Sequence, residues 1–177
     1  MDLGVISSRY AKALLKSATE AGVESQVYDD MQLLYHSYLD VQQLRFTIDN
    51  PMLSKDTKQS LLATACGGNP VELTRRFFAL VLREDRENAL QLMAASYITL
   101  YRKQKNIIQG KLTTAVPVTP KMEQKMRQMV EKRAHGNVEF NVEVDPSILG
   151  GFVLEYDTYR MDASVKTRLQ TVLTQLK

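Results

Sequence analysis

Apolar residues recur every three or four positions along the first part of the chain, and every second position in stretches of the remainder. A period near 3.6 is typical of amphipathic helices, and strict alternation is typical of half-buried strands. The period changes near Asn106. The pattern therefore predicts two domains, a helical one over residues 1–105 and a mixed one over residues 106–177.

Six helices are expected in the first domain. They cover residues 6–21, a segment with apolar positions from 27 to 38, then 41–48, 54–65, 69–82 and 90–101. Ser54 is suited to cap the fourth helix, and Asn69 followed by Pro70 to open the fifth. Because the fifth helix is apolar on more than one side, its residues can both fill a core and face a partner. Six such helices predict a bundle.

The second domain is expected to follow the order β-α-β-β-α, which makes the chain an α+β protein with a mostly antiparallel sheet. Alternation predicts strands over 108–116 and 138–144, and a hairpin formed by 152–156 and 159–161 around Asp157 and Thr158. A helix between the first two strands has a face expected to be core: Met122, Met126, Met129 and Val130. Ser164 opens the last helix, whose apolar face is Val165, Leu169, Val172, Leu173 and Leu176.

The adjacent glycines Gly150 and Gly151 raise the possibility of a phosphate loop. A P-loop needs a lysine and a hydroxyl after its last glycine, and a dinucleotide fingerprint needs a third glycine that opens a helix. Neither pattern is present in this sequence. The apolar residues on both sides favour a bend that leads into a strand.

No other combination of residues indicates catalysis, a cofactor or a metal site. The two histidines, His36 and His135, have no second ligand three or four positions away, and the single cysteine, Cys66, is expected to be a buried and inert thiol. The carboxylate pairs lie in polar helix or turn positions. We therefore expect a protein without catalytic residues, bound cofactor or metal.

The charge distribution argues against binding of nucleic acid. The formal net charge is +3, and the basic residues between 121 and 133 have no aromatic side chain among them for bases to stack on. No apolar run approaches the roughly 20 residues that cross a bilayer, and the N-terminus has no pattern of a signal or transit peptide. These features predict a protein of a reducing, cytoplasm-like compartment that does not insert into the membrane.

Four stretches together resemble the delta subunit of F-type ATP synthases, which is called OSCP in mitochondria. They are "SSRYAKALLKSA" (7–18), "NPMLSKDTKQSLL" (50–62), "LVLREDRENAL" (80–90) and "VEFNVEVDPSILGGFVLEYDTYRMDASVKTRLQTVLTQL" (138–176). The last stretch carries a strand, Asp-Pro, the glycine pair, a hairpin, Asp-x-Ser and a leucine-containing helix in the family's order. It departs from the family at Ala163, where glycine is usual.

The resemblance implies a non-catalytic stator subunit, present once per complex, peripheral to the bacterial inner membrane on its cytoplasmic face. Its first domain would bind the N-terminal helix of an alpha subunit in a groove between the first and fifth helices. The matching residues are Tyr10, Ala13, Leu14, Ser17, Arg76, Phe77, Leu80 and Val81. Its second domain would hold the C-terminal ends of the b subunits, with Leu169, Leu173 and Leu176 as contacts, although the same face of the last helix is also expected to cover the sheet. The family's structural turns in the second domain would be formed by Gly150, Gly151, Asp162 and Ser164.

Three other functions stay open on the sequence alone. A generic helical adaptor with an unrelated partner would show the same apolar helices. A small enzyme could assemble a site from scattered residues. An RNA-binding α+β domain would bind with an affinity that falls steeply with salt, although the near-neutral halves disfavour it.

Overall fold

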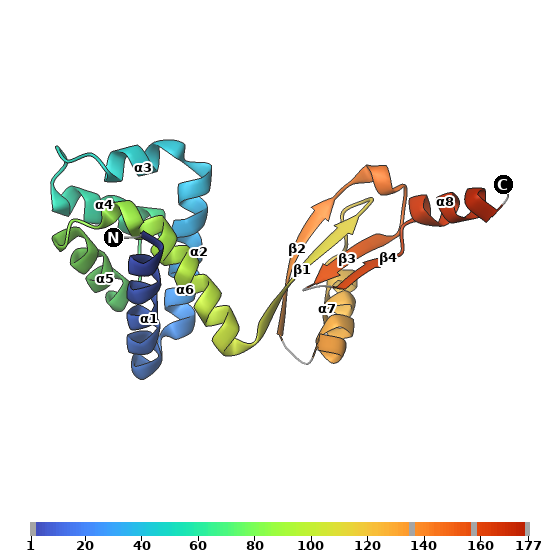
Figure 1. Cartoon of the computed structure of the whole chain (residues 1–177), viewed down its shortest axis with the longest axis horizontal. Coiled ribbons are helices and arrows are strands. Elements are labelled where there is room, and N and C mark those ends of the chain that lie inside the picture. Colours follow the sequence, from blue (N-terminus) through green and yellow to red (C-terminus); the bar gives the residue numbers. More distant parts are fainter. Residues whose placement is uncertain (1–2, 135–136, 157–158, 176–177) are drawn as a thin grey trace. The chain divides into compact units, whose positions relative to one another are not determined.

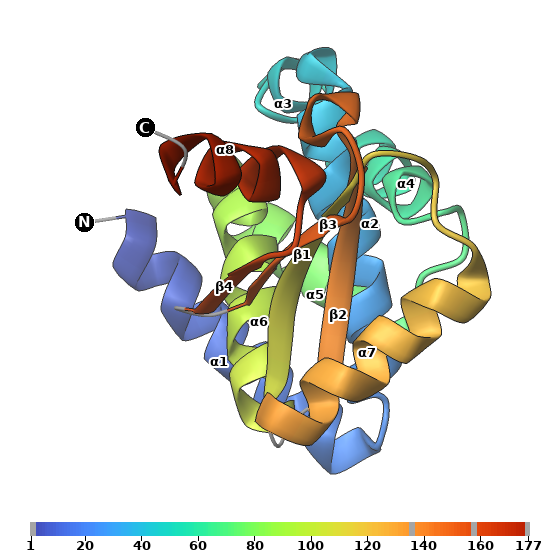
Figure 2. The same cartoon turned by 90° about the vertical axis from the view of Figure 1, so that its right-hand side faces the viewer.

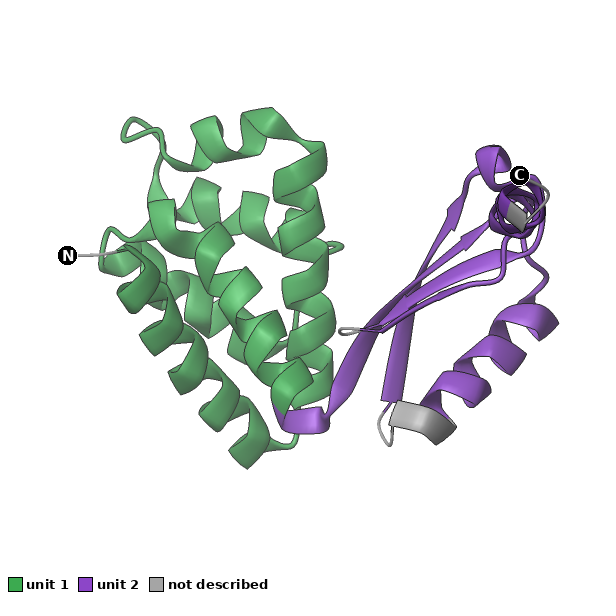
Figure 3. Cartoon of the chain, turned by 45° about the vertical axis from the view of Figure 1, so that its right-hand side comes forward, with its two compact units in different colours: residues 1–103 green, residues 104–177 purple. Residues whose placement is uncertain are grey.

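The computed structural model describes residues 3–134, 137–156 and 159–175. The chain forms two compact units, residues 1–103 and residues 104–177, so the division falls near the end of the last helix of the first unit (Figure 3). The first unit is helical and the second contains a sheet. The predicted α+β class is confirmed.

Within the described residues the first unit consists of helices alone (Figure 1). They are α1 (Leu3–Ala21), α2 (Glu24–Asp40), α3 (Gln42–Ile48), α4 (Lys55–Ala65), α5 (Glu72–Arg83), the short 3-10 helix η1 (Glu87–Ala89) and α6 (Leu90–Lys105). Phe78, Tyr97 and Met31 are its largest fully buried side chains. The hydroxyl of Tyr97 donates to the backbone oxygen of Glu24 over 3.1 Å, which satisfies the one polar atom of a ring taken out of water.

The start of α4 follows the sequence prediction. The Ser54 hydroxyl accepts a hydrogen bond from the N–H of Thr57 over 3.2 Å, as an N-cap residue should. After the helix, Gly67 and Gly68 have φ angles of +84° and +86°. This left-handed backbone is cheap for glycine, so the pair ends α4 and turns the chain towards α5.

The start of α5 does not follow the prediction, because Asn69 does not cap the helix. Asn69 lies too early in the chain, and its side-chain oxygen accepts from Arg75 instead. The hydrogen-bond acceptor at the start of α5 is the carboxylate of Asp30 in α2. It accepts from the N–H of Val71 over 3.0 Å and from the hydroxyl of Thr74 over 2.7 Å. Burial raises the pKa of Asp30. A side chain from another helix has replaced the local cap.

The second unit is a four-stranded sheet in the order β2-β1-β3-β4, with two helices (Figures 1 and 2). Its described elements are β1 (Ile107–Thr114), α7 (Pro120–Ala134), β2 (Asn137–Val144), the 3-10 helix η2 (Pro146–Ile148), β3 (Phe152–Tyr156), β4 (Tyr159–Asp162) and α8 (Val165–Gln175). β1 pairs in parallel with β2, while β1 with β3 and β3 with β4 are antiparallel. The residues that join β3 to β4, Asp157 and Thr158, lie outside the described part.

The core of the second unit lies between the sheet and α7. Leu112 is paired with Val142 on one side and Leu154 on the other, and Leu112, Leu154, Val138 and Val130 form the buried cluster. The expectation that Met122 and Met129 belong to this core is wrong, because both side chains are exposed. The face of α7 that packs on the sheet includes Met126 and Val130, and is narrower than the spacing of its methionines suggested.

Candidate functional site

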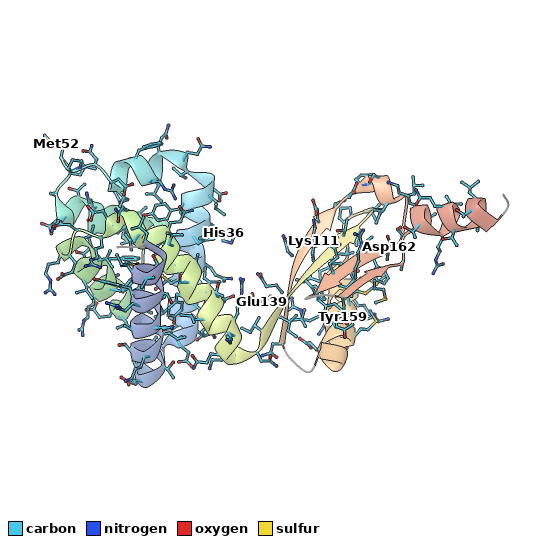
Figure 4. The ribbon with its side chains drawn as sticks, viewed as in Figure 1. His36, Met52, Lys111, Glu139, Tyr159 and Asp162 are labelled. Atoms are coloured by element: carbon cyan, nitrogen blue, oxygen red, sulfur yellow. The ribbon has the colours of Figure 1, made fainter. Side chains whose placement is uncertain are left out.

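The described residues contain no arrangement suited to catalysis or metal binding. No group of three or more His, Cys, Asp or Glu side chains among them could hold a metal ion. Burial raises the pKa of the Cys66 thiol to about 12, so this cysteine stays protonated and unreactive at neutral pH. His36 is exposed on α2 (Figure 4), and His135 lies outside the described residues. What the structure offers instead is exposed apolar surface.

In the first unit, α1 and α5 meet through an aromatic contact. The rings of Tyr10 and Phe77 lie edge to face, with 6.5 Å between their centroids. The guanidinium of Arg86 sits 5.7 Å from the centroid of the Tyr10 ring, a favourable cation–π geometry. Tyr10 is half-buried in this arrangement, whereas Phe77 is buried. The Phe77 ring therefore lies below the surface, and part of the Tyr10 ring is accessible to a partner.

The eight residues predicted for this surface fall into two classes. Leu14, Phe77 and Val81 are buried, so they shape the surface from below and cannot themselves reach a partner. The remaining members are half-buried or exposed: Tyr10, Ala13, Ser17, Arg76 and Leu80. Leu80 is the large apolar member, with 40% of its surface exposed, and Arg76 pairs with Glu72 over 3.0 Å. We call these five accessible residues the α1/α5 surface.

In the second unit, the predicted turn residues Gly150 and Gly151 lie between η2 and β3. Gly151 has a φ of +75°, and a Cβ built on it would lie 2.3 Å from the backbone oxygen of Ala163. That separation is too short for any side chain, so glycine is required. Ala163 itself does not have a positive φ, which explains why alanine fits where glycine is usual in the family. The atoms nearest to a Cβ on Gly151 are backbone atoms of Ala163 and Ser164, as expected for a structural bend.

Asp162 and Ser164 form the start of α8. Asp162 accepts the N–H of Ser164 and the hydroxyl of Thr167, each over 2.9 Å, and the Ser164 hydroxyl accepts the N–H of Thr167 over 3.2 Å (Figure 4 labels Asp162). These bonds favour the ionised carboxylate and hold the pKa of Asp162 below its usual value. A helix of only 11 residues needs such help at its first turn.

The apolar face of α8 is uncovered. Its described members have 40–62% of their surface exposed: Val165, Leu169, Val172 and Leu173. We call these four residues the α8 stripe. Leu176, the third predicted contact, lies outside the described residues. The expectation that this face also covers the sheet is wrong, because α7 closes the core alone and α8 extends beyond the end of the sheet (Figures 1 and 2).

One hollow and several exposed apolar side chains of the structure were not expected from the sequence. A hollow of about 490 Å³ lies between α4 and α5, and Phe78 is its one aromatic lining residue. Phe46 near the end of α3 and Met52 in the following loop are exposed, and so is Leu149 at the end of η2. Periodicity gave no signal for Met52 and Leu149, because they lie in a loop and at the end of a three-residue 3-10 helix. None of the described helices is long and apolar enough to cross a membrane.

Comparisons with known proteins agree with this picture. The sequence profile of the ATP synthase delta (OSCP) subunit matches residues 6–176. An ATP synthase subunit delta from Phocaeicola vulgatus is 48% identical over 99% of this chain and 95% of its own length. One from Bacteroides fragilis is 45% identical over the same shares.

A solved structure shares the fold. It is a chain of the cryo-EM structure of the Toxoplasma gondii mitochondrial ATP synthase hexamer, with a TM-score of 0.63 and 23% identity over 96% of both chains. The profile and the relatives decide against an unrelated adaptor, an enzyme or an RNA-binding domain. The chain belongs to the ATP synthase delta (OSCP) subunit family, whose members are non-catalytic components of the peripheral stalk of ATP synthase.

Proposed function

We propose that this chain ties the catalytic head of an ATP synthase to its membrane-anchored b subunits. Its six-helix bundle binds the N-terminus of an alpha subunit, and its β-α-β-β-α domain binds the C-terminal ends of the b subunits. One copy per complex serves at the cytoplasmic face of the bacterial inner membrane. By resisting rotation of the head, it allows proton-driven rotor torque to be used for ATP synthesis.

Each compact unit has an exposed apolar surface of its own, which supports a binding role for both units. A stator must hold two partners at once, and members of this non-catalytic family act through binding. An apolar face that the unit's own core leaves open is suited to a partner helix. Two such faces on separate units allow both partners to be bound without competition.

For the head, support comes from the chemistry of the α1/α5 surface. Ala13 and Ser17 are small and exposed on α1, so a partner helix can approach that backbone closely. Leu80 on α5 and the open part of the Tyr10 ring on α1 provide apolar contacts. A helix-in-groove interface of standard size buries roughly 1,200–2,000 Å², enough for a specific and stable complex.

For the stalk, support comes from the α8 stripe. Four large apolar side chains on an 11-residue helix are left in water although the same unit has a closed core elsewhere. Covering apolar surface contributes about 25 cal/mol per Å² before the costs of association. Leu169 and Leu173 therefore remain the proposed stalk contacts, and Val165 and Val172 join them.

The test is calorimetry on the full chain. A synthetic peptide from the N-terminus of the alpha subunit of the same organism is titrated into the protein, and one-to-one binding is expected. Absence of heat and of binding by a second method, with a folded protein, would contradict the proposed contact with the head.

A further inference from the structure

Leu149 has a backbone conformation and an environment that do not suit leucine. Its φ is +65°, in the left-handed region where an L-residue with a branched side chain is strained. It ends η2, where its N–H donates to the oxygen of Pro146. Glycine is the residue usually found at this position of a helix end, because it adopts the left-handed conformation without cost.

Burial does not account for Leu149 either. Its side chain is 64% exposed, so it contributes little to the core of the second unit. The strained backbone of Leu149 and its exposed apolar side chain are each unfavourable for the folded chain in the absence of a partner. Such strain is typical of positions that serve binding.

The position of Leu149 connects it to the α8 stripe. The N–H of Val165, the first residue of that stripe, donates to the oxygen of Gly150 over 3.0 Å. A Cβ built on Gly150 would lie 3.0 Å from a methyl carbon of Val165. Gly150, the residue next to Leu149, is thus in contact with the N-terminal end of the stripe, which places the Leu149 backbone beside it.

The charges beside the stripe indicate what kind of helix it binds. At 100° per residue, Lys166 falls on one side of the stripe and Arg168 on the other. The sequence between Val165 and Gln175 has no acidic residue. The nearby carboxylates, Asp145 and Asp162, are already engaged with Ser147 and with the first turn of α8.

We propose that Leu149 is an anchor residue of one docking surface, formed with the α8 stripe, for an amphipathic helix whose apolar face is bordered by acidic side chains. The left-handed backbone presents the Leu149 side chain outward, where a glycine would present none. The occupant is the C-terminal helix of a b subunit, so the inference rests on the proposed stalk function and adds a residue and a charge pattern to it.

The test compares full-length variants for folding and for binding. The probe is the soluble part of the b subunit of the same organism, without its membrane anchor. Leu149→Gly removes the side chain and Leu149→Asn makes it polar, and both residues suit the left-handed backbone, so their thermal unfolding midpoint should not fall. Their affinity for the probe should fall about tenfold, as expected for an anchor residue. Met122→Ser, an exposed apolar residue of α7, is the matched control and should bind like the wild type.

Leu169→Asp separates this inference from the proposed function. If Leu169→Asp fails to bind while the Leu149 variants bind as the wild type does, the stalk function stands and the role of Leu149 is refuted. If the wild type itself does not bind the probe, both are refuted. Loss of affinity in the Leu149 variants together with a falling unfolding midpoint would also refute the anchor role, because the residue would then be structural.

Discussion

The carboxylate of Asp30 in α2 accepts the hydroxyl hydrogen of Thr74 in α5 over 2.7 Å, in a buried setting. The same oxygen accepts the N–H of Val71, which would otherwise have no partner at the start of α5. One side chain thus joins the second helix to the helix that carries Leu80. The bond thereby ties the first turn of α5 to α2.

Asp30→Ala should destabilise the first unit by about 2–3 kcal/mol, because it leaves a part-buried N–H and a buried hydroxyl without an acceptor. Urea unfolding measures the change. Asp29→Ala is the control: its side chain is exposed on the same helix, and its cost should stay within about 0.5 kcal/mol. Equal unfolding curves for the two variants would show that the tertiary cap contributes nothing.

Gly151→Ala should cost about 2 kcal/mol or more, because the new methyl group would collide with the oxygen of Ala163 and the φ of +75° disfavours alanine. Gly150→Ala is the natural comparison. Its backbone is not left-handed and its neighbour is a side-chain methyl of Val165, which can move, so its cost should be under about 1 kcal/mol. Thermal unfolding of the second unit measures both, and a larger loss for Gly150→Ala would contradict the steric account.

Asp162 should make the stability of the second unit depend on pH. Its pKa is lowered in the folded state, chiefly by its hydrogen bonds to Ser164, so the unfolded chain takes up the proton more readily. The stabilisation is therefore present above an unfolded pKa of about 3.9 and is lost as the pH falls through the folded pKa.

Asp162→Asn isolates this contribution. The difference in unfolding midpoint between the wild type and Asp162→Asn should be constant from neutral pH to about pH 5 and shrink below about pH 4. Asp40→Asn, at the exposed end of α2, controls for removal of a charge. Parallel curves for the wild type and Asp162→Asn down to pH 2 would rule out the assigned role.

Leu80→Asp should weaken binding of the alpha-subunit peptide at least about tenfold, because it places a charge in an apolar contact. Since Leu80 is exposed on α5, the variant should fold normally. Leu92→Asp, an equally exposed leucine of α6, is the control and should bind as the wild type does. Calorimetry measures the affinities, and wild-type affinity in a folded Leu80→Asp variant would remove Leu80 from the contact.

Several of these features could be predicted from the sequence, because long elements show their period. The helix with Val27, Met31 and Leu34 on one face, and the cap by Ser54, required only local patterns. The resemblance to a family identified the chain as a stator component without any structure. Local signals were sufficient wherever the interaction partners were close in the sequence.

Other features depend on contacts between distant residues and could not be predicted. Asp30 lies 41 residues before Val71, so no local motif showed the cap that replaced Asn69. Periodicity also could not separate Phe77, which is buried, from Leu80, which is exposed, because α5 is apolar on several sides. The α8 stripe is exposed because the buried cluster of the second unit is covered by α7 and includes no residue of α8. The spacing of apolar residues does not show which of two helices covers a sheet.

Whether one chain holds both the head and the stalk can be measured by sedimentation velocity. The full chain is mixed with the alpha-subunit N-terminal peptide, carrying a fluorescent label, and with the soluble part of the b subunit. We expect the label to sediment with a complex that contains all three components. Leu80→Asp should release only the peptide, and Leu169→Asp only the b subunit. Mutually exclusive binding of the two partners to the wild-type chain would contradict this expectation.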